Sequence, residues 1–444
     1  MFHLLARDRW HEIAGQVSTN LLDDQVLAVT HWSPEPYELL DDLHRLEPLS
    51  PENLQPNFKV LQDSRNGPAG IYVRVHTARS ASAHELLSSL AEGCGFSIQY
   101  SPIAARQFAD RNCVIHVDDR SLSLLFDGLT IPFGNLWRWR GSQIEIVTGR
   151  EIDPDEQLQF QRESAERMLR AALLTFPEAR QLGHSRLALG ALLFHNGMAA
   201  DAAHLFRVQL EAEPRSVLES PAAFNLGKSL LSLREPSAAL DAFTMSLDSS
   251  VSPQDLRVSA YLYTGRLQMA LGREQAAILT LMRGLAVAEQ TALEGDAALM
   301  LSAAYLLNNN PQGANAVLLE RTRELTASHL RNAAAFAASL ARYRAAVLAD
   351  RKQREGTTLV ASIAGFHPEQ EFGTQWSFLL ADACFDLGLI SSAEESYLTT
   401  IRALPECPLR DQAILKLAHL YRAEDRLDEA NGLLTQLSPE STPP

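Results

Sequence analysis

The pattern of apolar and polar positions changes about one third of the way along the chain. Between Ile71 and Val147, short runs alternate apolar and polar residues as strands do, and two runs with helical spacing interrupt them. From Asp155 onward, apolar residues recur almost entirely at helical spacing. The pattern predicts a mainly α protein in which a small α+β module at residues 71–148 precedes a long helical region at residues 155–437.

The helical region contains an internal repeat. Its clearest unit has a Leu-Gly pair, then a small residue, an aromatic and a proline, at Leu189, Gly190, Ala202, Phe206 and Pro214. Gly227 and Gly265 repeat the glycine after 37 and 38 residues. The pattern resembles the tetratricopeptide repeat, a helix pair of about 34 residues. That resemblance implies an α-solenoid, because one pair cannot bury its apolar face alone and must stack on others.

Looser copies of the unit follow towards the C-terminus. Their marker residues are Ala239, Phe243, Gly272, Ala277, Tyr305, Ala314, Gly388, Ala393, Tyr397, Pro405, Tyr421 and Ala430. The stretch from Ser328 to Asp350 lacks both Gly and Pro. We expect it to form one long helix with its apolar residues on the buried side, namely Leu330, Phe336, Leu340, Tyr343 and Leu348.

The front module is predicted to have the order β-α-β-β-α-β-β. Ser82 and Ser121 stand where helix N-caps are expected, and Gly93 or Gly95 is expected to end the first helix. Gly141-Ser142 is expected to join the last two strands. The predicted strands and helices are residues 71–75, 83–92, 96–100, 113–117, 122–129, 136–140 and 143–147.

This order and spacing resemble the short N-terminal domain of secretins and TonB-dependent proteins of the bacterial envelope. The likeness lies in residues 83–91, 95–100, 114–117, 122–129 and 141–147. It implies a small protein-interaction module in a cell-envelope setting. The chain departs from the pattern at Ile131-Pro132, and no secretin ring or receptor barrel follows the module, so a role in a secretion pore or a receptor is not implied.

Residues 1–70 are expected to form a helical segment and linker. Helices are predicted within Trp10–Trp32 and after Ser33-Pro34, and a hairpin is predicted in which Asn66-Gly67 lies between residues 58–61 and 71–75. Residues 438–444 are expected to be a disordered tail. The first ten residues resemble the interior of a helix, which favours a start inside a longer gene product.

Charge and hydropathy restrict the partners. The formal net charge of −15 and the pI near 5.4 argue against nucleic acid, which requires concentrated Lys and Arg. The chain has no apolar run of membrane-spanning length and no recognisable signal peptide. The envelope-type resemblance implies the periplasm or cell envelope, with membrane association through an envelope complex. If the resemblance is set aside, the protein is expected in the cytoplasm.

Motifs for chemistry are lacking. The sequence has no nucleophile elbow, phosphate-binding loop, dinucleotide fingerprint or metal-ligand spacing, so no catalytic residue, cofactor or metal is predicted. His195 and His204 are expected to be partly exposed polar residues. A disulfide between Cys94 and Cys113 and buried free thiols are both compatible with the sequence, and the redox state of Cys384 and Cys407 is equally open.

The expected function is therefore binding. In the repeat register Lys228 and Arg266 each follow a glycine and should face the inner groove side by side, where they would bind a carboxylate or an acidic peptide. Trp137 and Trp139 are expected to cover the module's core, or alternatively to form a ligand-contacting ribbon. The main prediction is a non-enzymatic scaffold for a protein or peptide partner. The alternatives are a cytoplasmic regulatory adaptor and, less favoured, a hydrolase that uses the module.

Overall fold

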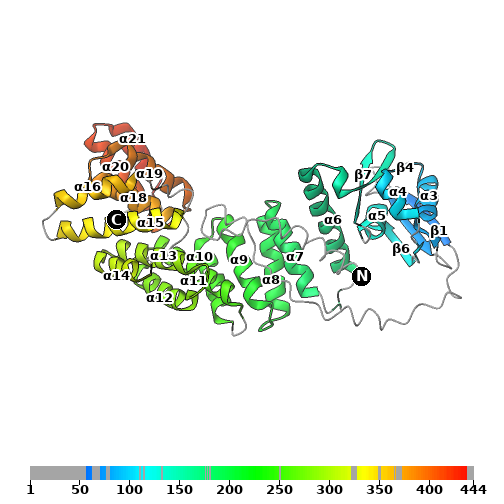
Figure 1. Cartoon of the computed structure of the whole chain (residues 1–444), viewed down its shortest axis with the longest axis horizontal. Helices are drawn as coiled ribbons and strands as arrows, with labels where there is room; N and C mark the ends of the chain where they lie inside the picture. Colours follow the sequence, from blue (N-terminus) through cyan, green and yellow to red (C-terminus); the bar gives the residue numbers. More distant parts are fainter. Residues whose placement is uncertain are drawn as a thin grey trace. The chain divides into compact units, whose positions relative to one another are not determined.

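A computed structural model describes residues 57–437 apart from short gaps at 63–70, 77–80, 110–111, 114–115, 132–133, 176, 178, 180–181, 250–251, 322–327, 349–351, 365 and 367–372. These residues form two compact units, one ending at Leu192 and the other beginning at Leu193 (Figure 1). The predicted N-terminal helices, the Asn66-Gly67 turn and the tail lie outside the described residues.

The first unit opens with the α/β module. Its elements in chain order are β1 (Asn57–Gln62), β2 (Ile71–His76), β3 (Ala81–Ser82), α3 (Ala83–Cys94), β4 (Ser97–Tyr100), α4 (Pro102–Ala109), β5 (Asn112–Cys113), β6 (His116–Ser121), α5 (Leu122–Thr130), β7 (Asn135–Arg140) and β8 (Gln143–Thr148). A short 3-10 turn, η5 (Gly149–Glu151), leads to α6 (Pro154–Thr175).

The strands form three small sheets. β1, β2 and β6 make an antiparallel sheet, β3 pairs with β5, and β8 lies between a parallel β4 and an antiparallel β7. β1 and β2 pair from Asn57 opposite His76 to Gln62 opposite Ile71, which confirms the predicted hairpin. The hairpin places β1, from the stretch expected to be a linker, in the same sheet as the module.

Local sequence explains the module's helices. Ser82 Oγ accepts a hydrogen bond from the Glu85 N–H, and Gly95 ends α3 in the left-handed conformation at φ 75°, as predicted. Helix α4 was not predicted, and two strands, β5 and β6, are present where one strand was predicted over residues 113–117. Helix α4 starts at Pro102 and buries only Ala104 and Phe108, a pattern too short to stand out.

Helix pairs make up the rest of the chain, beginning with α7 (Leu182–His195), which spans the boundary between the units. Its successors are α8 (Ala199–Ala212), α9 (Glu219–Ser232), α10 (Pro236–Asp248), α11 (Gln254–Ala270), α12 (Glu274–Ala288), α13 (Glu294–Leu307), α14 (Pro311–Arg321), α15 (Ser328–Leu348), α16 (Lys352–Ile363), α18 (Thr374–Asp386), α19 (Ile390–Ala403), α20 (Pro408–Ala423) and α21 (Leu427–Leu434).

Within the second unit these helices form a tetratricopeptide-like α-solenoid (Figure 1). Successive helices from α8 to α16 pack on one another, and α11, α13 and α15 also pack side by side as the first helices of successive pairs. Helix α15 runs unbroken from Ser328 to Leu348 with Phe336, Leu340 and Tyr343 buried, which confirms the predicted long helix.

One backbone device ends the first helix of six pairs. The second residue after each helix has a positive φ, and the next N–H bonds back to a carbonyl five residues earlier, as in Arg273 N–H to Gln268 O at 2.8 Å. Only half of these residues are glycine, because Asn, Asp and even Arg can tolerate the left-handed region at an exposed turn. The six are Gly197, Arg234, Gly272, Asn309, Gly388 and Asp425.

The repeat glycines permit close helix contact. A Cβ added at Gly227 would lie 2.8 Å from the Phe243 ring, and one at Gly265 would lie 2.5 Å from the Leu281 side chain. Real Cβ atoms do not approach so closely, so the second helix of each pair packs against bare backbone here. This geometry confirms the steric role expected for the Gly-to-aromatic spacing at Gly227.

Within the second unit, the helix pairs near the C-terminus also contact helix pairs much earlier in the chain. Helices α18 and α20 both contact α11, and α18 also contacts α13. Gln375 Nε2 donates to the backbone oxygen of Arg266 at 3.1 Å, although the two residues are far apart in sequence. The first helices of distant pairs therefore share one inner surface.

Candidate functional site

Lys228, predicted to bind a partner, is fully buried. Its side chain has 0% exposure, and its Nζ forms no hydrogen bond or ion pair within the described part of the chain. The Lys228 Nζ lies over the face of the Phe194 ring, 5.8 Å from the ring centroid. Burial lowers the pKa of Lys228 well below the ordinary lysine value, because desolvation disfavours the ammonium form.

Arg266 occupies the equivalent position on α11 and is only partly buried. Its guanidinium lies 5.8 Å from the Tyr263 ring centroid and close to the backbone of Gly373. It lines a cavity of about 90 Å³ together with Tyr263, Gln375 and Leu404. Lys228 is not among the residues that line this cavity. The expected role of the two residues in partner binding stays a prediction.

A larger hollow of about 420 Å³ lies elsewhere on the inner surface, and we call it the Asp382 pocket. Every lining residue belongs to, or directly follows, a first helix of a pair, here α13, α15, α18 or α20. Its lining combines apolar side chains with charged and polar ones: Leu306, Leu307, Asn309, Arg344, Val347, Asp382, Phe385, Asp386, Lys416 and His419.

Asp382 is the hub of a hydrogen-bond network in this pocket. Its Oδ1 accepts from the Tyr397 hydroxyl at 2.7 Å, and its Oδ2 accepts from Lys416 Nζ at 2.6 Å and from Arg344 Nη2 at 3.4 Å. Arg344 Nη1 also donates to Leu306 O at 2.8 Å, near the end of α13. One carboxylate therefore connects α15, α18, α19 and α20.

Tyr397 fixes the orientation of the hub. Its side chain is fully buried, and burial, reinforced by the Asp382 carboxylate, raises the pKa of the Tyr397 hydroxyl well above its ordinary value. The hydroxyl thus remains protonated at neutral pH and donates its hydrogen bond to Asp382 Oδ1. From the repeat pattern, Tyr397 is predicted only to pack as the repeat aromatic, and the charged members of the network have no sequence signal.

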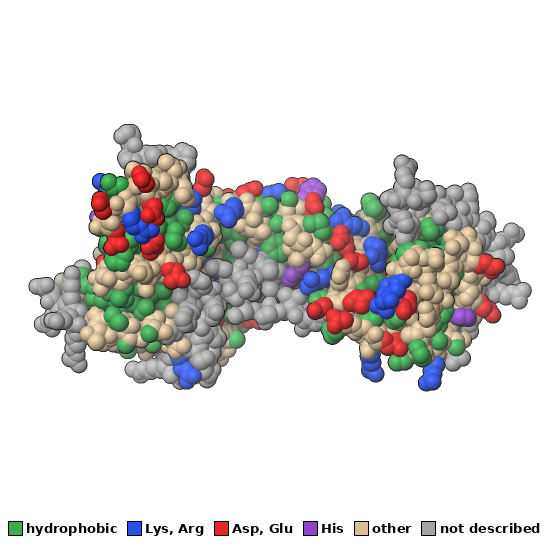
Figure 2. Space-filling model, turned by 90° about the horizontal axis from the view of Figure 1, so that it is seen from above, with side chains coloured by type: hydrophobic (Ala, Val, Ile, Leu, Met, Phe, Trp, Pro, Cys, Tyr) green, Lys and Arg blue, Asp and Glu red, His purple; other side chains and the backbone are tan. Residues whose placement is uncertain are grey.

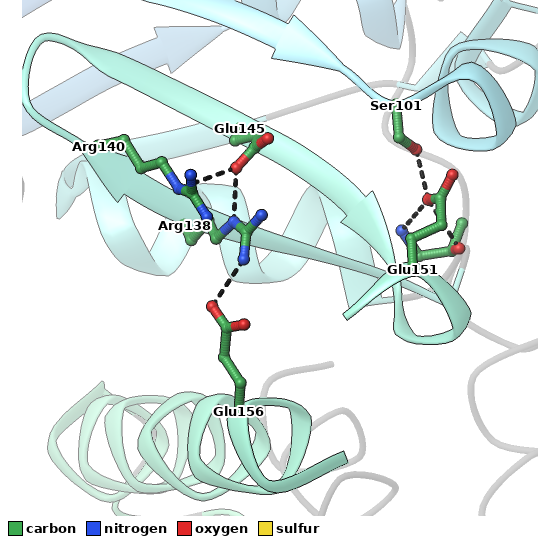
Figure 3. A network of polar contacts seen from close by, with 7 residues as sticks. Ser101, Arg138, Arg140, Glu145, Glu151 and Glu156 are labelled. Carbon is green, nitrogen blue, oxygen red and sulfur yellow. Dashed lines mark hydrogen bonds and ion pairs between the residues drawn. The ribbon is translucent and has the colours of Figure 1, made fainter. Parts of the chain in front are cut away.

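In the front module, a second polar network connects the β7–β8 hairpin to α6 (Figure 3). Arg138 on β7 pairs with Glu145 on β8 and also with Glu156 on α6, at 2.7 Å. Nearby, Glu151 Oε2 accepts from the Ser101 hydroxyl at 2.6 Å and from the Thr148 N–H at 2.9 Å. These contacts hold in place the segment that leads from β8 through η5 to α6.

An ion pair between a buried carboxylate and a partly exposed arginine completes this attachment. Asp127 on α5 has no exposure, and it accepts from Trp137 Nε1 at 2.7 Å and from Arg167 Nε on α6 at 3.1 Å. Trp137 is itself buried, and Trp139 packs edge-on against Phe96 of the core. The tryptophans therefore cover the module's core, as the main sequence interpretation expected, and α6 is fastened to the module.

The other chemistry-bearing groups of the described residues show no metal-binding arrangement. Among the residues that the structure describes, no three or more His, Cys, Asp and Glu side chains are grouped as metal ligands. Cys94, Cys384 and Cys407 carry free thiols. No described helix is long and apolar enough to cross a membrane. The face in Figure 2 intersperses acidic and basic side chains instead of presenting a field of one sign.

Comparisons with known proteins give a likeness in fold alone. No protein-family model matches the chain, and no curated protein is similar to it. A tetratricopeptide repeat protein from Parabacteroides merdae is 16% identical, with a TM-score of 0.41 over 60% of this chain and 94% of that one. Pseudomonas aeruginosa PilF is 16% identical, with a TM-score of 0.33 over 55% of this chain and 97% of that one. MamA is 18% identical, with a TM-score of 0.32 over 39% of this chain and 96% of that one.

Proposed function

We propose that the chain is a non-enzymatic scaffold that binds a protein or peptide partner on the inner surface of its solenoid. The supporting observation is that a hollow of about 420 Å³, the Asp382 pocket, is lined by the first helices of four pairs and the turn after one of them. Residues from Leu306 to His419 thus contribute to one recess that no single repeat could form. A recess with apolar walls and a few fixed charged groups is typical of binding sites.

Within this proposal, Arg266 contacts the partner at the smaller cavity, and the sequence-based pairing of Arg266 with the buried Lys228 is tested beside it. A Lys228→Glu/Arg266→Glu double variant should lose partners that the intact chain recovers in a pull-down. Because a glutamate at the buried Lys228 position can unfold the chain, Arg266→Glu alone is the second variant, and Arg331→Glu, at an exposed site on α15, is the matched control. Unchanged recovery by both Arg266 variants would remove these two residues from the site.

The setting we propose is a bacterial cell envelope, with the front module making a second protein contact. The support is the likeness of the module's strand and helix order to the short N-terminal domain of envelope proteins. A cytoplasmic regulatory adaptor is the alternative. Cell fractionation of the C-terminally tagged chain, expressed from its own gene with the upstream region, separates the two: recovery in the cytosolic fraction alone would refute the envelope setting.

A further inference from the structure

We propose that the cavity of about 90 Å³ beside Arg266 binds a neutral primary carboxamide, the group that ends an Asn or Gln side chain and many small amides. The inference deepens the proposed function, on which it rests for the role of this cavity, by naming the chemistry that the cavity selects. The cavity lies within the second unit, where α9, the start of α10, α11, α18 and the end of α19 meet.

Gln375 supplies a buried hydrogen-bond acceptor that has no donor in the described part of the chain. The side chain is 2% exposed, and its Nε2 donates to the backbone oxygen of Arg266 at 3.1 Å. Because a backbone oxygen can only accept, this contact assigns the other amide atom as the carbonyl oxygen. That oxygen, Oε1, is closed to solvent and forms no hydrogen bond with the described residues. A buried acceptor without a donor is costly, so a ligand N–H that reaches Gln375 from the cavity would be stabilising.

Arg266 and the start of α18 create the opposite requirement, an acceptor on the ligand. The Arg266 guanidinium carries only donors, and it lies so close to Gly373 that a Cβ added there would be 2.5 Å from Nη2. Thr374, the first residue of α18, also lines the cavity, and the N-terminus of a helix carries a partial positive charge. A ligand oxygen is therefore favoured on this side, whereas a cation is repelled.

A neutral group that both donates and accepts satisfies the two sides together. A carboxylate accepts from Arg266 but leaves Gln375 Oε1 without a donor, and an amidinium donates to Gln375 but meets the positive charge of Arg266. A ketone lacks the donor. A primary carboxamide carries an acceptor and a donor on one carbon, with no net charge. Sites built to hydrogen-bond a group reject analogues that lack it, because the polar atoms of the site then stay unpaired.

Size and lining restrict the rest of the ligand. Since a cavity of about 150 Å³ holds benzene, this one holds about four non-hydrogen atoms, which is a carboxamide and the next carbon. Ala403 is exposed and lines the same cavity, so the opening lies at the end of α19 and a longer aliphatic stem would leave there. Most of the wall is apolar and comes from Leu231, Pro236, Leu267, Ala270, Leu404 and Pro405.

Four probes of equal size test the assignment on the full-length protein: propionamide, propionate, propionamidinium and butanone. Binding is measured by NMR titration of isotope-labelled chain, in which the Gln375 side-chain amide signal is the one lost in Gln375→Leu. We expect propionamide to bind at least about tenfold more tightly than each of the others, since each of these leaves one side of the cavity unsatisfied. The fifth probe is N-acetyl-glutamine methylamide. Tighter binding of this probe than of propionamide identifies a protein side chain as the source, and equal or weaker binding identifies a free small amide.

Substitutions then place the site. Gln375→Leu should remove the preference for propionamide over butanone, and Arg266→Met should remove the preference over propionamidinium. Ala403→Trp, at an exposed position, should block every probe without disturbing the core. Gln209→Leu replaces a buried glutamine on α8, away from the cavity, and as the matched control it should change neither preference. Thermal unfolding shows that each variant is folded.

The assignment would be overturned if any of the other three small probes bound as tightly as propionamide, if no probe bound, or if the preference survived Gln375→Leu. Because the probes need no partner, these outcomes are separate from the scaffold function. Loss of partner capture in Arg266→Glu beside any of them would leave the scaffold function standing and refute the ligand chemistry alone. Selective binding of propionamide with unchanged capture would support the ligand chemistry and remove Arg266 from the partner site.

Discussion

Replacing Lys228 by Met should stabilise the protein. Methionine has a similar length and fills buried space well, and the substitution removes an amine that is fully buried and has no hydrogen-bond partner among the described residues. A buried polar group without a partner costs about 1–3 kcal/mol even when it is neutral. At a pH above about 10.4, where the amine is neutral in both states, the unfolding free energy of Lys228→Met should therefore exceed that of the unmodified chain by about this amount.

The gain should depend on pH in a defined direction. Burial holds the pKa of Lys228 in the folded chain well below its value in the unfolded chain, so the unfolded chain binds the proton more tightly. Stability of the unmodified chain then rises with pH from the lowered pKa up to about 10.4 and is constant above it. Across that window the advantage of the methionine variant falls by about 1.4 kcal/mol per pH unit.

Thermal unfolding followed by far-UV circular dichroism at pH 7.5, 9 and 10.5 measures both effects. Each kcal/mol corresponds to about 2–4 °C in a domain of this size. The control is Lys416→Met, because Lys416 is half-exposed and paired with Asp382; it should lower Tm slightly, with no gain at any pH. A Lys228→Met variant less stable than the unmodified chain at all three pH values would show that the amine has a stabilising partner, and would refute the reasoning.

Four further outcomes follow from the packing and the networks. Gly227→Ala should destabilise by about 1–3 kcal/mol in thermal unfolding, because its Cβ would meet the ring across the pair. Asp382→Ala should cost about 2–3 kcal/mol, since it leaves three donors without their acceptor. Asp127→Ala should cost about 1–3 kcal/mol and shift tryptophan fluorescence, because it leaves the buried indole N–H of Trp137 without its acceptor and removes one of the acidic partners of Arg167. Burial raises the pKa of Cys384 to about 11, so at pH 8 an aromatic disulfide reagent should modify half-buried Cys94 well before it modifies Cys384 in the native chain.

Most of the solenoid could be predicted because its determinants are local and repeated. Helical spacing, a small residue at the contact and an aromatic that fills the next space follow from helix geometry alone, and each recurs in several units. The turns were harder to predict. Arg234 and Asp425 adopt the same left-handed turn conformation as Gly197 and Gly272, although Arg and Asp do not predict that conformation from the sequence. The stacking of the helices determines the backbone conformation of the turn, and the residue at that position adopts it whatever its type.

The front module shows where short patterns fail. Six of the seven predicted elements are present, and the strand predicted over residues 113–117 is divided into β5 and β6. Helix α4 was missed because Ala104 and Phe108 are its only buried positions. The attachment of α6 to the module was also missed. It depends on Asp127, Trp137 and Arg167, which lie on three elements and whose pairing has no spacing that a sequence pattern can reveal.

The candidate sites separate two kinds of information. Repeat register predicts which side of the helix pair a residue faces, and it places Lys228 and Arg266 at equivalent positions. It does not predict what lies over that side, because the cover comes from other repeats: Phe194 lies beside Lys228, whereas Gly373 and Gln375 lie beside Arg266. Equivalent positions in a solenoid that returns on itself are thus unequal in solvation. A charged residue at such a position is evidence for a binding surface only once the stack around it is known.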